Sequence, residues 1–285
     1  MKKIDIAFIG GSGLYNIPEI KNIKWKKVKT NFGNLSSEIG ISKIGNMSLA
    51  FLPRHGKHHN ISPTKINYRA NIEALKKIGV QNIVSLSAVG SLRKDYKPGD
   101  FVLVNQFIDR TYNRKKSFFD DDLVVHIPFA QPICNNLKKK IALSLKKLKI
   151  KFHENGTYVC IEGPQFSSLA ESELYRSWGC DVIGMTNMPE AKLAMEAGIC
   201  YASVSMVTDY DCWHPDHDEV SVDQIISTLK LNSKKATDLI SHFCKNHNLE
   251  CNENIKTLSK KSIITDLSKV KKSTKQKLKY IIKGL

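Results

Sequence analysis

Three short segments of this sequence gather side chains that can bind an anion. A glycine-rich turn around Ser12 lets backbone N–H groups approach an anion, and the serine adds a hydroxyl donor. Arg54 and His55 combine a guanidinium fork with an imidazole, and both can donate to phosphate oxygens. Ser87 and Ala88 follow a short apolar run. Each segment alone also fits an ordinary turn or a solvated basic loop, but together they indicate an anion site.

Two further segments supply an aromatic residue and a pair of acids. Phe166 follows a Gly-Pro turn, where it can stack on a flat base or serve as a core anchor. Asp209 and Asp211 come just after an apolar run, and extended backbone would place both carboxyls on one side. A close carboxylate pair tends to hold one proton, which suits donation to N7 of adenine and acceptance from its 6-amino group. A metal-binding pair and a merely solvated pair are the alternatives.

The histidines and cysteines form no metal motif. Of the three histidines after Arg54, His58 and His59 are adjacent, so they lack the helical spacing of a ligand pair. The seven cysteines are odd in number and scattered, which favours reduced core residues over a disulfide framework or a zinc site. We therefore expect no metal.

Apolar runs and cap signals alternate along the chain, which predicts an α/β architecture with a largely parallel or mixed sheet. The runs that predict strands are residues 4–9, 83–87, 101–104, 158–161, 182–185 and 200–207. Helices are expected to start at Ser62, to span 168–178 and 189–197, and to start again at Ser221. Ligands of such sheets gather at the carboxyl ends of strands, and the polar segments above lie at such ends or in loops able to reach them.

The length of 285 residues and the 41% hydrophobic content allow one sizeable core. The formal charge of +17 is uneven, because residues 255–285 contain ten lysines and one aspartate. These lysines are not interleaved with arginines or aromatics, so a solvated face is favoured over a nucleic-acid surface. We expect a catalytic domain over residues 1–254 and a partly helical, lysine-rich tail over 255–285. The sequence has neither a signal peptide nor an apolar stretch of membrane length, so the expected location is the cytoplasm.

An ordered set of motifs connects these segments to a known family. The motifs are Gly-Gly-Ser-Gly at Gly10, Arg-His-Gly at Arg54, Asn-Tyr-Arg-Ala-Asn at Asn67, Gly-Ser-Leu at Gly90, Pro-Gly-Asp at Pro98, Gln-Phe-Ile-Asp-Arg-Thr at Gln106, His-Ile-Pro at His126, Glu-Gly-Pro at Glu162 and Thr-Asp-Tyr-Asp-Cys-Trp at Thr208. Together they resemble the methylthioadenosine phosphorylases, within the wider purine nucleoside phosphorylase family. The resemblance covers roughly residues 4–240 and implies a three-layer αβα fold with a central mixed β-sheet. No motif matches after about residue 253.

The resemblance implies a role for each matched position. The phosphate site would comprise Ser12, Arg54, His55, Ser87, Ala88 and Thr186. The substrate-binding set would comprise Met185 at the ribose, Phe166 at the base, Tyr210, Ser167, His126, Val222 and Ile225, the last four around an apolar methylthio pocket. His126 would come from a neighbouring subunit of a trimer. Asp209 and Asp211 would be the catalytic pair that reads the adenine edge.

The implied reaction is phosphorolysis of 5'-deoxy-5'-methylthioadenosine to adenine and 5-methylthioribose 1-phosphate, a step of purine and methionine salvage. No cofactor is implied, because inorganic phosphate is a co-substrate. The implied assembly is a homotrimer, or a hexamer built as a dimer of trimers, without nucleic-acid or membrane partners. Ser12 and Ser87 stand where threonine often occurs, and Gly184 stands where animal enzymes have asparagine, which puts one contact near the base in question.

Three alternatives remain open from the sequence. One is a phosphorylase of a different purine nucleoside or of methylthioinosine. A second is a nucleosidase that uses water, which would not need three anion-binding segments. The third is a nucleic-acid-binding protein driven by the basic tail.

Overall fold

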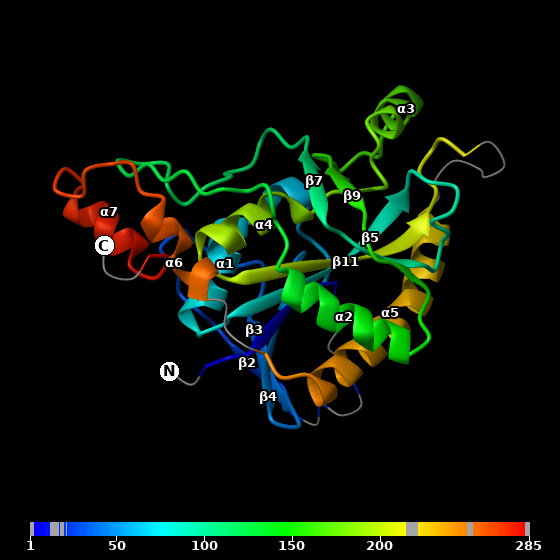
Figure 1. Cartoon of the computed structure of the whole chain (residues 1–285), viewed down its shortest axis with the longest axis horizontal. Helices are drawn as coiled ribbons and strands as arrows, with labels where there is room; N and C mark the ends of the chain where they lie inside the picture. Colours follow the sequence, from blue (N-terminus) through cyan, green and yellow to red (C-terminus); the bar gives the residue numbers. More distant parts are fainter. Residues whose placement is uncertain are drawn as a thin grey trace.

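The computed structural model describes residues 3–11, 17, 20, 22–214, 222–249 and 253–282, except for the side chains of 222–225 and 253. Its strands are β1 (Ile6–Gly10), β2 (Lys24–Lys26), β3 (Ile39–Ile44), β4 (Met47–Pro53), β5 (Asn82–Ser91), β6 (Phe101–Leu103), β7 (Gln106–Asp109), β8 (Phe152–His153), β9 (Thr157–Cys160), β10 (Val182–Gly184) and β11 (Cys200–Asp209). Its helices are η1 (Pro63–Lys65), α1 (Tyr68–Lys77), α2 (Asn135–Lys147), α3 (Leu169–Ser177), α4 (Asn187–Glu196), α5 (Val222–Asn246), α6 (Glu253–Lys261) and α7 (Lys272–Leu278) (Figure 1).

The strands of the described ranges form one mixed sheet, as the sequence predicted. Its main path runs β2-β3-β4-β1-β5-β10-β9-β7, and β11 pairs with both β5 and β6. Strands β4, β1, β5 and β11 are parallel neighbours, whereas β10 is antiparallel to β5 and β6 is antiparallel to β11. Because the four parallel strands point the same way, their carboxyl ends lie along one edge of the sheet.

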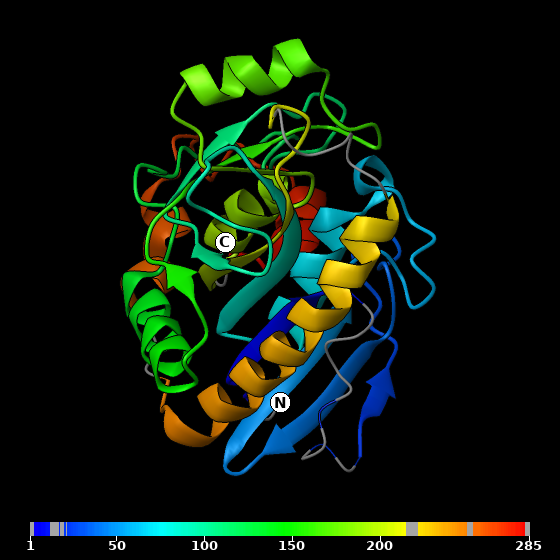
Figure 2. The same cartoon turned by 90° about the vertical axis from the view of Figure 1, so that its right-hand side faces the viewer.

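Two hydrophobic cores lie on opposite faces of this sheet, so the fold has the three layers that the resemblance implied. In β5, Ile83 and Val89 face one core, and Val84 and Leu86 face the other, as strand alternation requires. The first core includes residues of α1 and α4, and the second includes residues of α2 and α5. Figure 2 shows α5 lying along one face of the sheet, with α4 on the other side.

The predicted helix starts gave mixed results. Ser168 forms the expected capping box of α3: its hydroxyl accepts from the N–H of Glu171, whose carboxylate accepts from the N–H of Ser168. The start at Ser62 is wrong, because that residue makes no side-chain cap and precedes only the 3-10 turn η1. The cap of α1 is instead Asn67, whose side chain accepts from the N–H of Ala70. The start predicted at Ser221 lies outside the described residues.

The lysine-rich segment after residue 254 packs against the rest of the chain. Val270, Leu278, Ile281 and Ile282 are buried and belong to the same core as α1 and α4. The hydroxyl of Ser259 donates to the carbonyl of Glu196 at 2.6 Å. Apolar side chains of the segment therefore face the core. The domain boundary at 254/255 stays a prediction.

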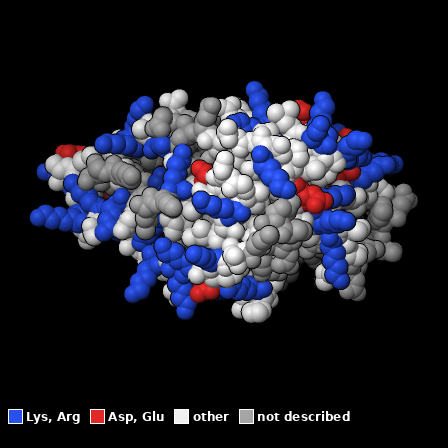
Figure 3. Space-filling view, turned by 90° about the horizontal axis from the view of Figure 1, so that it is seen from below, with Lys and Arg blue, Asp and Glu red and all other residues white. Residues whose placement is uncertain are grey.

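On one face of the molecule, cationic side chains are spread out and are not gathered in one stripe. Figure 3 shows lysines and arginines distributed across one whole face, with acidic residues between them. Over the described ranges, no helix is both long enough and apolar enough to cross a membrane.

Candidate active site

The carboxyl ends of the parallel strands bring the predicted anion-binding segments together. Gly10 of β1 pairs with Pro53 of β4, and the N–H of Arg54 donates to the carbonyl of Gly10 at 3.0 Å. Ile9 pairs with Ser85 of β5, so Ser87 lies level with the residues that follow β1. Ser12 itself lies outside the described residues. Two of the three segments thus meet at this edge, together with the start of the third.

Arg54 is buried, with 2% of its surface exposed, and forms an ion pair with Glu190 of α4. Its Nε and Nη2 donate to the two carboxylate oxygens at 2.8 and 3.0 Å. Nη2 also donates to the hydroxyl of Ser85 at 2.6 Å, and Nη1 donates to the carbonyl of Leu86 at 3.2 Å. Burial disfavours the charged guanidinium, but the charge of Glu190 and its hydrogen bonds raise the pKa of Arg54 above its usual range.

These contacts change how Arg54 can bind an anion. Sequence reasoning expected its planar fork to face phosphate, but Glu190 accepts from both arms of that fork. Four of the five guanidinium N–H groups are engaged, so one N–H of Nη1 remains for a ligand. Glu190 was missed in the sequence. Its helix also contains Lys192 and Glu196, so the sequence pattern of residues 187–197 does not single out Glu190 as the buried partner of an arginine.

His55 is held in one tautomer by the backbone. Its Nδ1 lies 2.8 Å from the carbonyl oxygen of Ile61. A carbonyl only accepts, so Nδ1 has the proton and Nε2 presents a lone pair when the ring is neutral. Burial and the charge of Arg54 lower the pKa of His55 to about 4. At neutral pH, Nε2 can therefore accept a hydrogen bond from a protonated oxygen of an anion such as hydrogen phosphate.

Two buried hydroxyls near Arg54 are available for a ligand. The Oγ of Ser87 and the Oγ1 of Thr186 have no hydrogen-bond partner among the described residues. Ser85, Ser87 and Val89 alternate onto the sheet face that α4 covers, so Ser87 shares this face with Arg54. Thr186 is the N-terminal cap residue of α4, the helix that contains Glu190, and makes no side-chain cap. Because buried polar atoms are normally paired, these two hydroxyls indicate a missing partner between β5 and α4. Ala88, which was also predicted to bind phosphate, follows Ser87 in β5.

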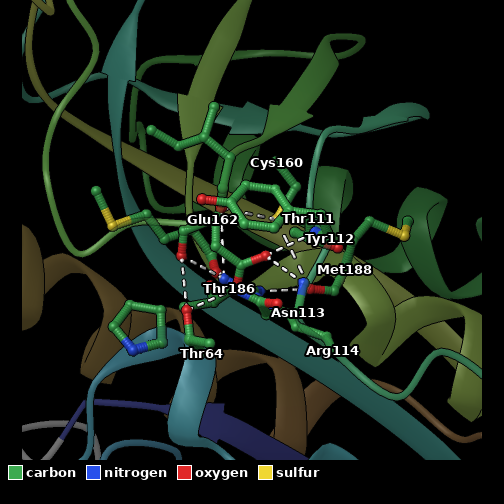
Figure 4. A network of polar contacts seen from close by, with 12 residues as sticks. Thr64, Thr111, Tyr112, Asn113, Arg114, Cys160, Glu162, Thr186 and Met188 are labelled. Atoms are coloured by element: carbon green, nitrogen blue, oxygen red, sulfur yellow. Dashed lines mark hydrogen bonds and ion pairs between the residues drawn. The ribbon is translucent and has the colours of Figure 1, made fainter.

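Arg114 is a second buried arginine that sequence reasoning missed, and it fixes the segment between β10 and α4. Its Nη1 donates to the carbonyls of Met185 at 2.7 Å and Met188 at 2.6 Å, and its Nε donates to Glu162 at 3.0 Å (Figure 4). Glu162 also accepts from the hydroxyl of Thr64 at 2.6 Å, and these contacts lower its pKa to about 2 despite burial. The network orients the loop on which the predicted ribose and phosphate residues stand.

Glycines allow close approaches around this loop. Gly163 has a φ of 67°, and a Cβ there would collide with the side chain of Met185. A Cβ at Gly184 would meet the hydroxyl of Tyr158, which accepts from the N–H of Thr186 at 3.4 Å. The hydroxyl of Tyr158 in β9 thus occupies the space that a side chain at position 184 would need.

The two acids lie close together, but not for the reason that the sequence suggested. Strand β11 ends at Asp209, and Asp211 has a φ of 53°, so extended geometry does not continue between them. Instead, the N–H of Asp211 donates to Oδ1 of Asp209 at 2.8 Å. A Cβ at Gly90 would lie 2.9 Å from that same oxygen, so only glycine leaves room for the pair. Burial raises the pKa of both carboxyls, and the charge of Asp209 raises that of Asp211 further.

The remaining predicted substrate residues differ in their surroundings. Phe166 is 49% exposed, and the buried Oγ of Ser167 has no partner in the described part of the chain. The carbonyl of Ser167 accepts from Cys212 at 3.4 Å, which places this loop beside the acid pair. Tyr210 is buried, and its hydroxyl lies 3.5 Å from the carbonyl of Lys94.

Three further residues were assigned to the methylthio pocket, and the structure describes the side chain of one of them, His126. His126 is exposed, and its N–H donates to the carbonyl of Ser262 at 3.0 Å. Val222 and Ile225 lie in the first turn of α5, but their side chains are outside the described residues. In the described ranges, no group of three or more histidine, cysteine, aspartate or glutamate side chains could hold a metal ion.

Comparisons of the sequence with known proteins point to one family. The sequence profile of the Phosphorylase superfamily matches residues 5–245. An S-methyl-5'-thioadenosine phosphorylase from Cereibacter sphaeroides is 54% identical over 239 residues, which are 84% of this chain and 82% of that protein. One from Koribacter versatilis is 46% identical over 282 residues, which are 98% of this chain and 95% of that protein.

Solved structures that are similar to this chain come from the same family. A methylthioadenosine phosphorylase from an Antarctic soil metagenomic library has a TM-score of 0.93 at 41% identity, over 99% of this chain and 100% of that chain. The Schistosoma mansoni methylthioadenosine phosphorylase in complex with adenine has a TM-score of 0.86 at 32% identity, over 91% of this chain and 99% of that chain. The chain therefore belongs to the phosphorylase superfamily, and within it to the methylthioadenosine phosphorylases.

Proposed function

We propose that this chain catalyses phosphorolysis of 5'-deoxy-5'-methylthioadenosine to adenine and 5-methylthioribose 1-phosphate. The observation that carries the proposal is the pair of unpartnered hydroxyls of Ser87 and Thr186 beside a buried arginine. These hydroxyls can donate hydrogen bonds, so the partner they lack must be a bound ligand that accepts them. Inorganic phosphate meets that requirement, and relatives named for this reaction support it.

Phosphate would be held by donors of different strength. Ser87, Thr186 and Ser12 each donate a hydroxyl proton, and Arg54 donates its remaining N–H. Nε2 of His55 accepts a hydrogen bond from the protonated oxygen of hydrogen phosphate, which leaves the unprotonated phosphate oxygens free to attack C1' of the ribose. Ala88 contributes backbone to the same cradle. Positioning of this kind matters because phosphate is a weak nucleophile toward a glycosidic carbon.

The leaving base would be stabilised at the other end of the site. Asp209 in its protonated form donates to N7 of adenine, so the base departs without full negative charge. Asp211 accepts from the 6-amino group, which selects a 6-aminopurine. The burial that raises both pKa values supports this division, because the pair then holds a proton more readily than exposed carboxyls do. Met185 lies against the ribose, and Phe166 covers the base with Tyr210 nearby.

The methylthio group would be enclosed by a second subunit. Ser167, Val222 and Ile225 supply one wall, and His126 reaches the site of its neighbour in a homotrimer. The exposure of both Phe166 and His126 in the single chain supports this assembly. We propose a role in purine and methionine salvage in the cytoplasm, with phosphate as co-substrate and no cofactor or metal.

The decisive experiment is a substrate panel assayed with and without phosphate. We expect phosphate-dependent release of adenine from methylthioadenosine, with slower turnover of adenosine and of methylthioinosine. Equal release of adenine without phosphate would instead identify a nucleosidase. Faster turnover of methylthioinosine would contradict the assigned role of Asp211. Sedimentation velocity on the same preparation tests the trimer.

A further inference from the structure

Tyr201 is a buried tyrosine whose hydroxyl contacts the ion-pair partner of Arg54. It lies in β11, belongs to the core that includes residues of α4, and has 2% of its surface exposed. Its hydroxyl donates to Oε1 of Glu190 at 2.9 Å, and the same oxygen accepts from Nη2 of Arg54 at 3.0 Å. The tyrosine hydroxyl and the guanidinium therefore share one carboxylate oxygen.

A second route of hydrogen bonds connects Tyr201 to Arg54. Nη2 of Arg54 donates to the hydroxyl of Ser85 at 2.6 Å. The hydroxyl of Ser85 in turn makes a hydrogen bond with that of Tyr201. Because Ser85 accepts from Arg54, its own proton is free to donate to Tyr201, whose proton goes to Glu190. The four side chains thus form a closed ring of hydrogen bonds.

The donors and acceptors of this ring have fixed directions. A guanidinium only donates and an ionised carboxylate only accepts. Burial and the charge of Glu190 raise the pKa of Tyr201 well above its usual value, so its hydroxyl keeps the proton that it donates. Both N–H groups of Nη2 are used inside the ring, and Nε donates to the other oxygen of Glu190. The ring therefore holds the guanidinium plane, and with it the direction of the free N–H on Nη1.

Tyr201 also limits how strongly Glu190 neutralises Arg54. The carboxylate and a bound anion compete for the same guanidinium charge. A hydroxyl that donates to Oε1 offsets part of the negative charge on that oxygen. Without the hydroxyl, Glu190 would attract Arg54 more strongly and leave less positive charge for a ligand. The effects of the ring on orientation and on charge therefore act in the same direction.

We propose that Tyr201 is a positioning residue for phosphate, which acts through Glu190 and Ser85 on the free N–H of Arg54. This inference rests on the proposed function, because it takes phosphate as the anion bound beside Arg54. The ring of Tyr201 packs in the core, so the effect on phosphate comes from the hydroxyl. Removing that hydroxyl should weaken phosphate binding and leave nucleoside binding unchanged.

The test compares Tyr201→Phe with the wild type in steady-state kinetics and in calorimetric titration with inorganic phosphate. We expect the KM for phosphate, and its Kd in the absence of nucleoside, to rise about five- to tenfold. The KM for methylthioadenosine and the kcat at saturating phosphate should stay within about twofold of the wild-type values. A hydroxyl that only stabilises the fold would lower Tm without separating the two substrates.

Tyr96→Phe is the matched control. Tyr96 is 9% exposed, and its hydroxyl donates to the carbonyl of Asn155 at 3.0 Å, outside the ring. This variant loses one hydroxyl hydrogen bond as well, but it should keep the wild-type KM and Kd for phosphate. In an Arg54→Lys background, Tyr201→Phe should change the KM for phosphate by less than about twofold, because lysine cannot complete the ring.

Three results would overturn the proposal. They are a Tyr201→Phe protein that binds phosphate as tightly as the wild type, one in which both KM values rise alike, and a full Tyr201→Phe effect in the Arg54→Lys background. Adenine release by the wild type without phosphate would instead refute the proposed function. The phosphate titration would then still decide the role of Tyr201 at the anion site.

Discussion

The backbone N–H of Asp211 donates to Oδ1 of Asp209 at 2.8 Å, so the two acids at the end of β11 are joined by a main-chain bond. The other oxygen of Asp209 accepts from the hydroxyl of Thr208 at 2.7 Å. These contacts fix the Asp209 carboxyl in one orientation, while burial favours its protonated form. It is therefore prepared to donate to a leaving base.

The first prediction concerns this carboxyl. Asp209→Asn should lower kcat for methylthioadenosine by about 10²- to 10⁴-fold, because the amide cannot transfer a proton to N7. The KM for phosphate should change by less than about threefold, since Asp209 has no contact with the residues around Arg54. Steady-state kinetics with each substrate varied in turn provide the measurement. A KM for phosphate that rises as much as kcat falls would assign Asp209 a structural role instead.

The second prediction compares two serines on the same face of β5. Ser87→Ala should leave the free energy of unfolding unchanged, because the Oγ of Ser87 has no protein partner to lose. It should raise the KM for phosphate about tenfold, since a charge-assisted hydrogen bond to the anion disappears.

Ser85→Ala is the matched control for that variant. The hydroxyl of Ser85 accepts from Arg54 at 2.6 Å, so its loss should cost about 1–3 kcal/mol in urea unfolding. If Ser87→Ala is as unstable as Ser85→Ala, or binds phosphate normally, Ser87 does not belong to an anion site.

The sequence correctly placed the site at the edge of the sheet where the parallel strands end. Motif order and strand alternation can both be read from residues that are neighbours in the sequence. Arg54 follows β4 and Asp209 ends β11, and parallel strands bring such ends together. Ser87 was expected at the end of its strand but lies inside β5, which continues to Ser91. The capping box at Ser168 could also be predicted from the sequence, because it involves two residues only three positions apart.

The partners of these residues depend on contacts across the chain. Glu190 is 136 residues from Arg54, and Arg114 is 71 residues from Met185, so no spacing rule connects them. The cap of α1 was missed because Asn67 and Ser62 are both good caps, and the sequence alone does not select between them. The burial of apolar residues in the C-terminal segment was not predicted, because the many lysines around them suggested a solvated tail.

The third prediction follows from the lowered pKa of His55, about 4 in the folded protein against 6.5 for the unperturbed side chain. Because the folded state disfavours the protonated ring, this residue costs stability as the pH falls from about 6.5 towards 4. The loss should reach about 2 kcal/mol at pH 5.

Urea unfolding at pH 7 and pH 5 measures this effect as the difference between wild type and His55→Asn, which removes contributions from other groups. His58→Asn, at an exposed neighbour, should retain the wild-type loss. Identical losses in wild type and His55→Asn would show that His55 titrates normally. Saturating phosphate should also protect wild type more than His55→Asn at pH 7, because the anion binds only the folded site.

The last prediction concerns the lysine-rich segment, which packs its apolar residues into the core although its composition resembles a solvated tail. Leu278 of α7 is 1% exposed, so Leu278→Ala should lower the free energy of unfolding by about 2–5 kcal/mol through lost burial and a residual cavity. Leu231→Ala removes the same atoms from a leucine that is 70% exposed in α5, and should cost less than about 0.5 kcal/mol. Both variants should keep the wild-type KM for each substrate at a temperature where they are folded. If the two leucines cost the same, the segment contributes no core packing in solution, and its removal should leave a stable enzyme.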